Sequence, residues 1–216
     1  MNQANIIQTL APVLFTVEMA IYAILGTLGI VGLVLFVWRW NVLGKTEGDA
    51  PKWRKLLSAD IAKGSDLSHI AVTVEDERTL PGRIVKLGKD SAGLSPEALE
   101  KVYEVQESEE RRHLESGVSF LGTVGANAPF LGLTGTVLGI LIAFNKFAQG
   151  GGKGGPEVMV AIARALVATA LGLIVAIPAV VAFNILKNRI RQTMDRSREV
   201  RGLIVARSLH AASKES

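Results

Sequence analysis

Two long apolar stretches of this chain carry hydroxyl and amide side chains but no ionisable group. They run from Ser116 to Asn145 and from Ala165 to Leu186. Their polar side chains include Thr123, Asn127, Thr134, Thr136 and Thr169. In a membrane such groups usually face a bundle interior or a water path, where they supply hydrogen bonds or order water. A threonine can equally bond back to a carbonyl of its own helix, and the residues alone leave both readings open.

Residues suited to other chemistry are scarce. His69, His113 and His210 are scattered without the spacing of metal ligands, so each is interpreted as a surface histidine. The Gly150–Gly154 segment lacks the Ser or Thr that follows the lysine of a phosphate loop, and it is interpreted as a flexible turn. The chain has no cysteine, which excludes disulfides. We therefore expect no catalytic residue, no metal and no cofactor, and we do not expect an enzyme.

Both of these apolar stretches are long enough to be membrane spans. A helix needs about 20 apolar residues to cross a bilayer, and the short loop between the stretches makes them a hairpin. A third apolar block runs from Met19 to Trp38 and ends at Arg39 and Trp40, an interfacial anchor. No Lys or Arg precedes Arg39, whereas a cleaved signal peptide begins with a basic region. The sequence predicts an all-α membrane protein with three transmembrane helices.

The basic residues indicate how these spans are oriented. Residues 1–38 contain no Lys or Arg, residues 39–119 contain 13, and residues 187–216 contain 8. The positive-inside tendency then places the N-terminus and the glycine loop outside, with the middle region and the C-terminus in the cytoplasm. The net charge of +4 follows this topology, so we expect no nucleic-acid partner.

These patterns predict a division of the chain into seven parts. They are an outer lead (1–18), transmembrane helix 1 (19–40), a cytoplasmic helical region (41–115), transmembrane helix 2 (116–145), an outer loop (146–160), transmembrane helix 3 (161–186) and a cytoplasmic C-terminal helix (187–216). Within the cytoplasmic region, turn signals occur at residues 80–82 and 91–93. Ser95 and Pro96 open a helix that we expect to run unbroken into the second span.

Small residues recur along the second and third spans. Gly135 and Gly139 form a GxxxG motif, and a stripe of small residues follows one face of the third span: Ala161, Ala165, Ala168, Gly172 and Ala176. Such stripes allow close helix packing, either within the hairpin or between copies of the chain. Pro129 and Pro178 lie within the spans and are expected to introduce kinks.

Residues 128–140 (APFLGLTGTVLGI) and residues 165–184 (ALVATALGLIVAIPAVVAFN) resemble the second-span and third-span signatures of the MotA/TolQ/ExbB proton-channel family. The layout of three spans with a long cytoplasmic loop resembles the ExbB/TolQ branch. The resemblance implies a homopentamer in the bacterial inner membrane, with a periplasmic N-terminus and a cytoplasmic C-terminus. It also implies a pore that holds an ExbD/TolR-like single-span partner, with proton flow driving movement.

By position, Thr136 and Thr169 match the two pore-facing threonines of the family. Arg164, expected at the pore mouth, stands where ExbB and TolQ sequences carry an acid. Glu18 and Arg164 are the ionisable residues at the expected edges of the spans, and none lies at mid-span, so a titrating carboxylate must come from the partner. The outputs left open are transport, envelope maintenance and gliding motility. The alternative from another class is a structural membrane scaffold without ion flux.

Overall fold

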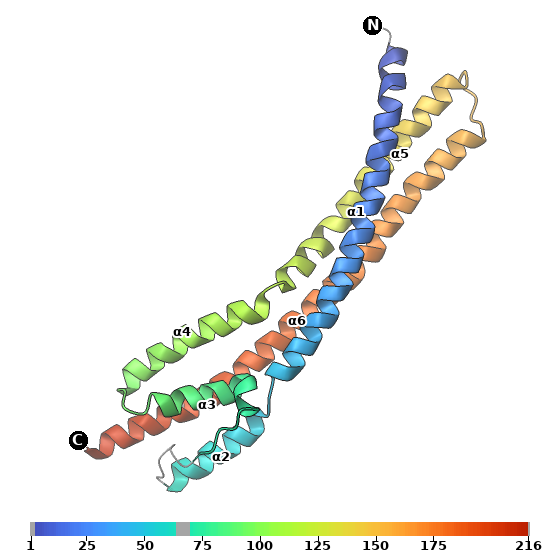
Figure 1. Cartoon of the computed structure of the whole chain (residues 1–216). Helices are drawn as coiled ribbons and strands as arrows, with labels where there is room; N and C mark the ends of the chain where they lie inside the picture. Colours follow the sequence, from blue (N-terminus) through green and yellow to red (C-terminus); the bar gives the residue numbers. More distant parts are fainter. Residues whose placement is uncertain (1–2, 64–69, 216) are drawn as a thin grey trace. The chain divides into compact units, whose positions relative to one another are not determined.

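The computed structural model describes residues 3–63 and 70–215, and within these the regular elements are all helices (Figure 1). The helices are α1 (Gln3–Thr46), α2 (Ala50–Lys63), the short 3-10 helix η2 (Asp76–Arg78), α3 (Leu80–Asp90), α4 (Pro96–Glu115), α5 (Val118–Gln149) and α6 (Pro156–Glu215). Helices α1, α5 and α6 are long and apolar enough to cross a membrane. The predicted all-α membrane fold with three spanning helices is confirmed.

The chain divides into two compact units. The first, here called the span unit, comprises Met1–Phe36 and Gly117–Asn184. The second, here called the basal unit, comprises Val37–Ser116 and Ile185–Ser216. The first part of α1, most of α5 and the first half of α6 belong to the span unit, and the shorter helices belong to the basal unit.

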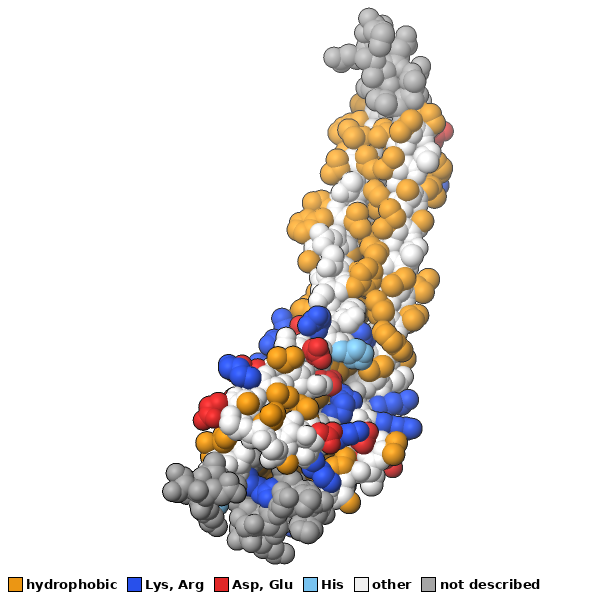
Figure 2. Space-filling model, turned by 60° about the vertical axis from the view of Figure 1, so that its left-hand side comes forward, with side chains coloured by type: hydrophobic (Ala, Val, Ile, Leu, Met, Phe, Trp, Pro, Cys, Tyr) orange, Lys and Arg blue, Asp and Glu red, His pale blue; other side chains and the backbone are white. Residues whose placement is uncertain are grey.

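The span unit buries small side chains and exposes large ones. Its core contains Ile21, Leu25, Val124, Ala128, Ala176 and Ala179. Outward-facing side chains such as Ile30, Phe130 and Leu166 are about two-thirds exposed. Figure 2 shows hydrophobic side chains over much of the visible surface of this unit, while most of the charged side chains lie on the basal unit. So large an apolar surface requires lipid or another apolar partner, as expected of a membrane-spanning unit.

The glycine-rich segment between α5 and α6 is a tight turn. Gly151 and Gly152 have positive φ angles of 66° and 78°, which a residue without Cβ adopts at little cost. The amide of Gly150 donates to the carbonyl of Lys146, and that of Gly152 to the carbonyl of Phe147. These bonds satisfy the last carbonyls of α5 and let α6 start at Pro156.

The basal unit has a hydrophobic core of its own. Four helices contribute buried side chains to it: Trp53 and Leu57 of α2, Ile84 and Val85 of α3, Leu99 and Tyr103 of α4, and Val200 and Ile204 of α6. The Tyr103 hydroxyl donates to the carbonyl of Ile84 at 3.1 Å. Burial raises the pKa of Tyr103, so the phenol stays protonated and keeps this donor at neutral pH.

Helix α3 corrects one expectation from the sequence. Residues 80–82 were expected to form a turn, but they open a helix whose N-cap is Thr79; the Thr79 hydroxyl accepts from the amide of Gly82 at 3.3 Å. A Cβ atom on Gly82 would lie 2.0 Å from the carbonyl oxygen of Asp76. The glycine is therefore required for close backbone approach and does not end the helix.

The junction at Gly117 corrects a second expectation. Helix α4 begins as predicted, with the Ser95 hydroxyl accepting from the amide of Ala98 and Pro96 in the first turn. It does not continue into the second span. It ends at Glu115, and α5 begins at Val118 after Gly117, whose φ of 75° lies in the left-handed region. A single residue of this conformation breaks the helical path.

The long helices also extend beyond the predicted limits of the spans. The predicted lead and first span form one helix, α1, from Gln3 to Thr46. Helix α5 runs to Gln149, past the predicted limit at 145, and α6 runs without interruption from Pro156 to Glu215. The membrane boundaries at 19–40, 116–145 and 161–186 stay predictions.

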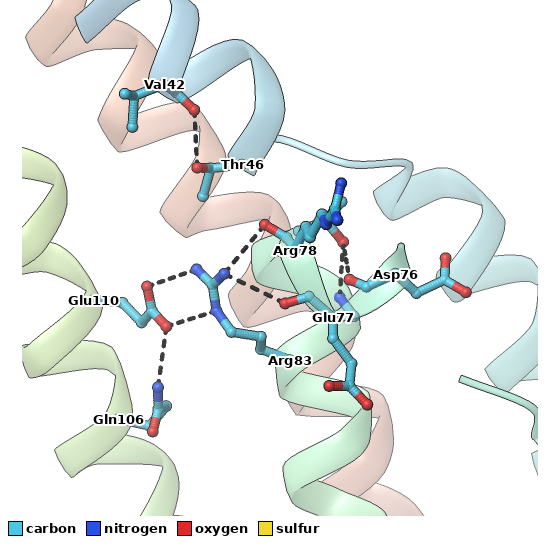
Figure 3. A network of polar contacts seen from close by, with 10 residues as sticks. Val42, Thr46, Asp76, Glu77, Arg78, Arg83, Gln106 and Glu110 are labelled. Atoms are coloured by element: carbon cyan, nitrogen blue, oxygen red, sulfur yellow. Dashed lines mark hydrogen bonds and ion pairs between the residues drawn. The ribbon is translucent and has the colours of Figure 1, made fainter. Parts of the chain in front are cut away.

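Ionic contacts hold the elements of the basal unit together. Arg83 of α3 donates to both carboxylate oxygens of Glu110 of α4, each at 2.7 Å, and to the carbonyl of Arg78 at 3.1 Å (Figure 3). Gln106 donates to the same carboxylate at 3.0 Å. Elsewhere in this unit, Arg189 of α6 pairs with Glu47 and stacks on the Trp40 ring at 4.2 Å. Bidentate pairs of this kind are geometrically specific as well as favourable.

Replacement of Arg83 tests the importance of this network. In Arg83→Met the mostly buried Glu110 carboxylate loses its counter-charge, so α3 and α4 should be destabilised by about 2 kcal/mol. Hydrogen–deuterium exchange of the detergent-solubilised protein should show faster exchange in both helices. The control is Lys101→Met, which removes an exposed ion pair with Glu104 and should leave the exchange unchanged. Equal exchange in the two variants would show that the Arg83 pair contributes nothing.

Candidate functional site

Helices α5 and α6 approach each other through residues with small side chains or none. A Cβ atom on Gly172 would lie 2.7 Å from the carbonyl oxygen of Ala128 and 3.1 Å from the Cα of Gly132. A Cβ on Gly135 would lie 2.5 Å from that of Ala168. The same contact repeats one turn further on, where a Cβ on Gly139 would lie 2.6 Å from that of Ala165. The stripe of small residues therefore packs within the hairpin of one chain.

The Thr169 side chain bridges the two helices of this hairpin. Its hydroxyl donates to the carbonyl oxygen of Gly132 at 3.3 Å. In a regular helix that carbonyl also accepts from the amide of Thr136, four residues later. The Thr169 hydroxyl therefore shares its acceptor with the backbone amide of Thr136. The Thr136 hydroxyl itself donates to the carbonyl of Leu133 at 2.7 Å, and both side chains are half-buried.

The other polar side chains of α5 bond back to their own helix. The Thr123 hydroxyl donates to the carbonyl of Ser119, the Asn127 amide to that of Thr123, and the Thr134 hydroxyl to that of Phe130. These contacts satisfy each donor locally. Thr169 differs from them because its donor reaches another helix.

The two prolines lie inside continuous helices. Pro129 falls within α5 and Pro178 within α6. Proline has no amide proton, so the carbonyls of Gly125 and Ile174, four residues earlier, lose the helical bond they would otherwise accept. Both freed carbonyls lie in the hairpin that holds the two threonines, and they add acceptors to an otherwise apolar region.

Arg164 contacts the first helix at a place that the sequence did not indicate. The Tyr22 hydroxyl lies 2.9 Å from the carbonyl oxygen of Arg164 and 3.0 Å from Oε1 of Glu18, and it can donate to either. Glu18 is only 3% exposed. The spacing of Glu18 and Tyr22, four residues apart, was the available signal for their pairing. The contact of Tyr22 with the Arg164 carbonyl, 142 positions away, required the fold.

The histidines do not gather into a site. His69 lies outside the described residues, and the carbonyl of His113 accepts from Arg39 at 3.3 Å in the basal unit. Across residues 3–63 and 70–215, no three His, Cys, Asp or Glu side chains are grouped as a metal site would require. The polar hairpin of α5 and α6 is therefore the candidate functional site.

The described residues form an all-helical fold with three helices that are long and apolar enough to cross a membrane. Two of these helices form a tightly packed hairpin that carries hydroxyl groups. These features define a multi-pass membrane protein. The sequence profile of the MotA/TolQ/ExbB proton channel family matches residues 76–199, more than half of the chain. The chain belongs to this family, and it is accordingly a channel-family subunit and not an enzyme.

Relatives within the family place the chain in the ExbB/TolQ-like branch. The biopolymer transport protein ExbB of Aquifex aeolicus is 38% identical over 130 residues, which cover 59% of this chain and 77% of that protein. The ExbB of Pseudomonas putida is 43% identical over 108 residues, covering 48% of this chain and 32% of that protein. The Tol-Pal system protein TolQ of Pseudomonas aeruginosa is 40% identical over 100 residues, covering 44% and 43%.

The glycine contact of the hairpin can be tested by adding one methyl group. In Gly172→Ala the new Cβ meets the α5 backbone, so α5 and α6 must separate, at a cost of about 1–3 kcal/mol. The melting temperature of the detergent-solubilised protein should fall by several degrees. Gly26→Ala is the matched control, because a Cβ there meets no atom within 4 Å. A Gly172→Ala protein as stable as the control would contradict this packing.

Proposed function

We propose that the chain is the multi-span subunit of a motor or stator that the proton-motive force drives in the bacterial inner membrane. Together with an ExbD/TolR-like single-span partner it forms a proton channel that energises transport, envelope or motility work. The observation that carries the proposal is the contact of the Thr169 hydroxyl with the Gly132 carbonyl, four residues before Thr136, inside the hairpin that the family profile covers.

The chemistry of the hairpin explains why a partner is required. A proton path needs a group that binds and releases a proton within the membrane, and residues 116–145 and 165–186 contain none. Hydroxyl groups and freed carbonyls can orient water or hold a carboxylate by hydrogen bonds. In the proposal, Thr136 and Thr169 line the pore and serve a carboxylate supplied by the partner's transmembrane helix.

Assembly and location complete the proposal. We infer a homopentamer around the partner helices, since large apolar side chains of the span unit face outward and family members work as membrane complexes. The chain is placed in the inner membrane with a periplasmic N-terminus and a cytoplasmic C-terminus. The distribution of Lys and Arg supports this orientation.

One observation favours a second candidate function. Arg164 adds a positive charge to the span unit, and a fixed cation opposes the entry of other cations. This favours a structural membrane scaffold without ion flux. Only the channel needs the hydroxyls of Thr136 and Thr169 for ion flux, so the consequences of removing them separate the two candidates.

Valine substitutions of the two threonines distinguish the proton channel from the scaffold. Thr169→Val and Thr136→Val keep the side-chain shape and remove the hydroxyl, so the complex should still co-purify with its partner while proton-gradient-dependent activity falls by about tenfold or more. Thr134→Val is the matched control, because Thr134 lies on the exposed side of α5 and outside the two positions that the resemblance assigns to the pore, and it should retain full activity. Full activity of the Thr136/Thr169 double variant would remove both residues from the mechanism and favour the scaffold.

The orientation can be tested in intact cells. The chain has no cysteine, so single cysteines introduced at Lys153, Lys101 and Arg198 report their own accessibility to an impermeant thiol reagent. Position 153 should be labelled from outside, and positions 101 and 198 only after the cells are opened. Labelling of position 101 in intact cells would refute the proposed topology.

A further inference from the structure

The span unit contains a cavity of about 200 Å³. Its charged lining consists of Glu18 of α1, Lys146 of α5 and Arg164 of α6. Its apolar lining includes Phe15, Ile142 and Val160. Each of the three long helices therefore contributes one charged residue to a space large enough for several water molecules.

Glu18 is the one acidic residue among those that line this cavity, and it is held in place. The side chain is 3% exposed although it belongs to an apolar helix, and Tyr22 lies within hydrogen-bond distance of its carboxylate. The same hydroxyl lies 2.9 Å from the Arg164 carbonyl, which places the Glu18 carboxylate beside the α6 backbone at that residue. Among the described residues Glu18 has no ion pair, so its charge acts on the whole cavity.

The balance of charge around the cavity gives Glu18 a role. Lys146 and Arg164 alone would make the cavity doubly positive, and like charges at short range repel an entering cation strongly where the dielectric constant is low. A carboxylate facing the same space offsets one of these charges and attracts cations. Removing that carboxylate would leave the positive charges unopposed.

We propose that this cavity is the ion-entry site of the channel and that Glu18 is its charge-compensating residue, which lets protons pass Arg164 and Lys146. This rests on the proposed function as a proton channel. Glu18 acts through its fixed negative charge, and the proton is carried by water in the cavity. The role is one of positioning and selectivity, and the partner still supplies the carboxylate that takes up the proton deeper in the membrane.

The test uses the full chain with its partner in vesicles that contain a pH-sensitive dye. Glu18→Gln should lower the rate of proton entry by about tenfold while leaving assembly intact, because it removes charge and keeps shape. Adding Arg164→Gln to Glu18→Gln should restore at least half of the wild-type rate. Glu157→Gln removes an exposed acid in the first turn of α6 and should have no effect.

The outcomes separate this inference from the function on which it rests. Wild-type rates in Glu18→Gln, or a double variant as slow as Glu18→Gln alone, would overturn the role of Glu18. If the role of Glu18 is overturned in this way but Thr169→Val lowers the rate of proton entry in the same assay, the proposed channel function still holds. A wild-type complex that admits no protons would overturn both. Should Glu18→Gln fail to assemble, Arg164→Gln decides: an unchanged or higher rate supports charge compensation, and a tenfold loss contradicts it.

Discussion

The contact between the backbones of α5 and α6 is the constraint on which the span unit depends. Gly132 and Gly172 face each other so closely that neither tolerates a Cβ atom without a shift of its neighbour. Between apolar helices in lipid the hydrophobic effect offers no driving force, so close van der Waals packing must hold them together. Only because the backbones meet here can the short side chain of Thr169 reach a carbonyl of the other helix.

The hairpin that this contact forms also brings several polar groups close together. Prolines free two carbonyls within the same hairpin, and Thr169 adds a hydroxyl that is not confined to its own helix. The outward faces of the same helices carry large apolar side chains that lipid or neighbouring subunits must cover. The hairpin thus combines polar groups where α5 and α6 meet with large apolar side chains on its outward faces.

The sequence predicted what depends on local pattern. Long uncharged runs identified the three spanning helices, Ser95 and Pro96 identified the start of α4, and the small residues identified a close packing face. The sequence-based prediction was wrong at two glycines, because a glycine can mark a turn, a close backbone contact or a break in a helix. Gly82 was interpreted as part of a turn but allows close backbone approach, and Gly117 interrupts a helix that was expected to run unbroken into the second span. Such choices depend on tertiary contacts that no local window contains.

The candidate site divides in the same way. Thr136 and Thr169 were selected from the sequence by resemblance, and the hydrogen bond from the Thr169 hydroxyl to the Gly132 carbonyl of α5 appeared only in the structure. The cluster of Glu18, Tyr22 and Arg164 was not anticipated, because it joins residues from opposite ends of the span unit in sequence. In the proposed function both features serve ion movement, and a partner supplies the protonatable group at mid-membrane.

That dependence on a partner is the central claim, and proton entry into sealed vesicles tests it most directly. Vesicles with this chain alone should be proton-tight, and addition of the single-span partner should open a path. Replacement of the partner's membrane carboxylate by an amide should close the path without dispersing the complex. Rapid proton entry through this chain alone, or through a complex whose partner lacks the carboxylate, would contradict the account.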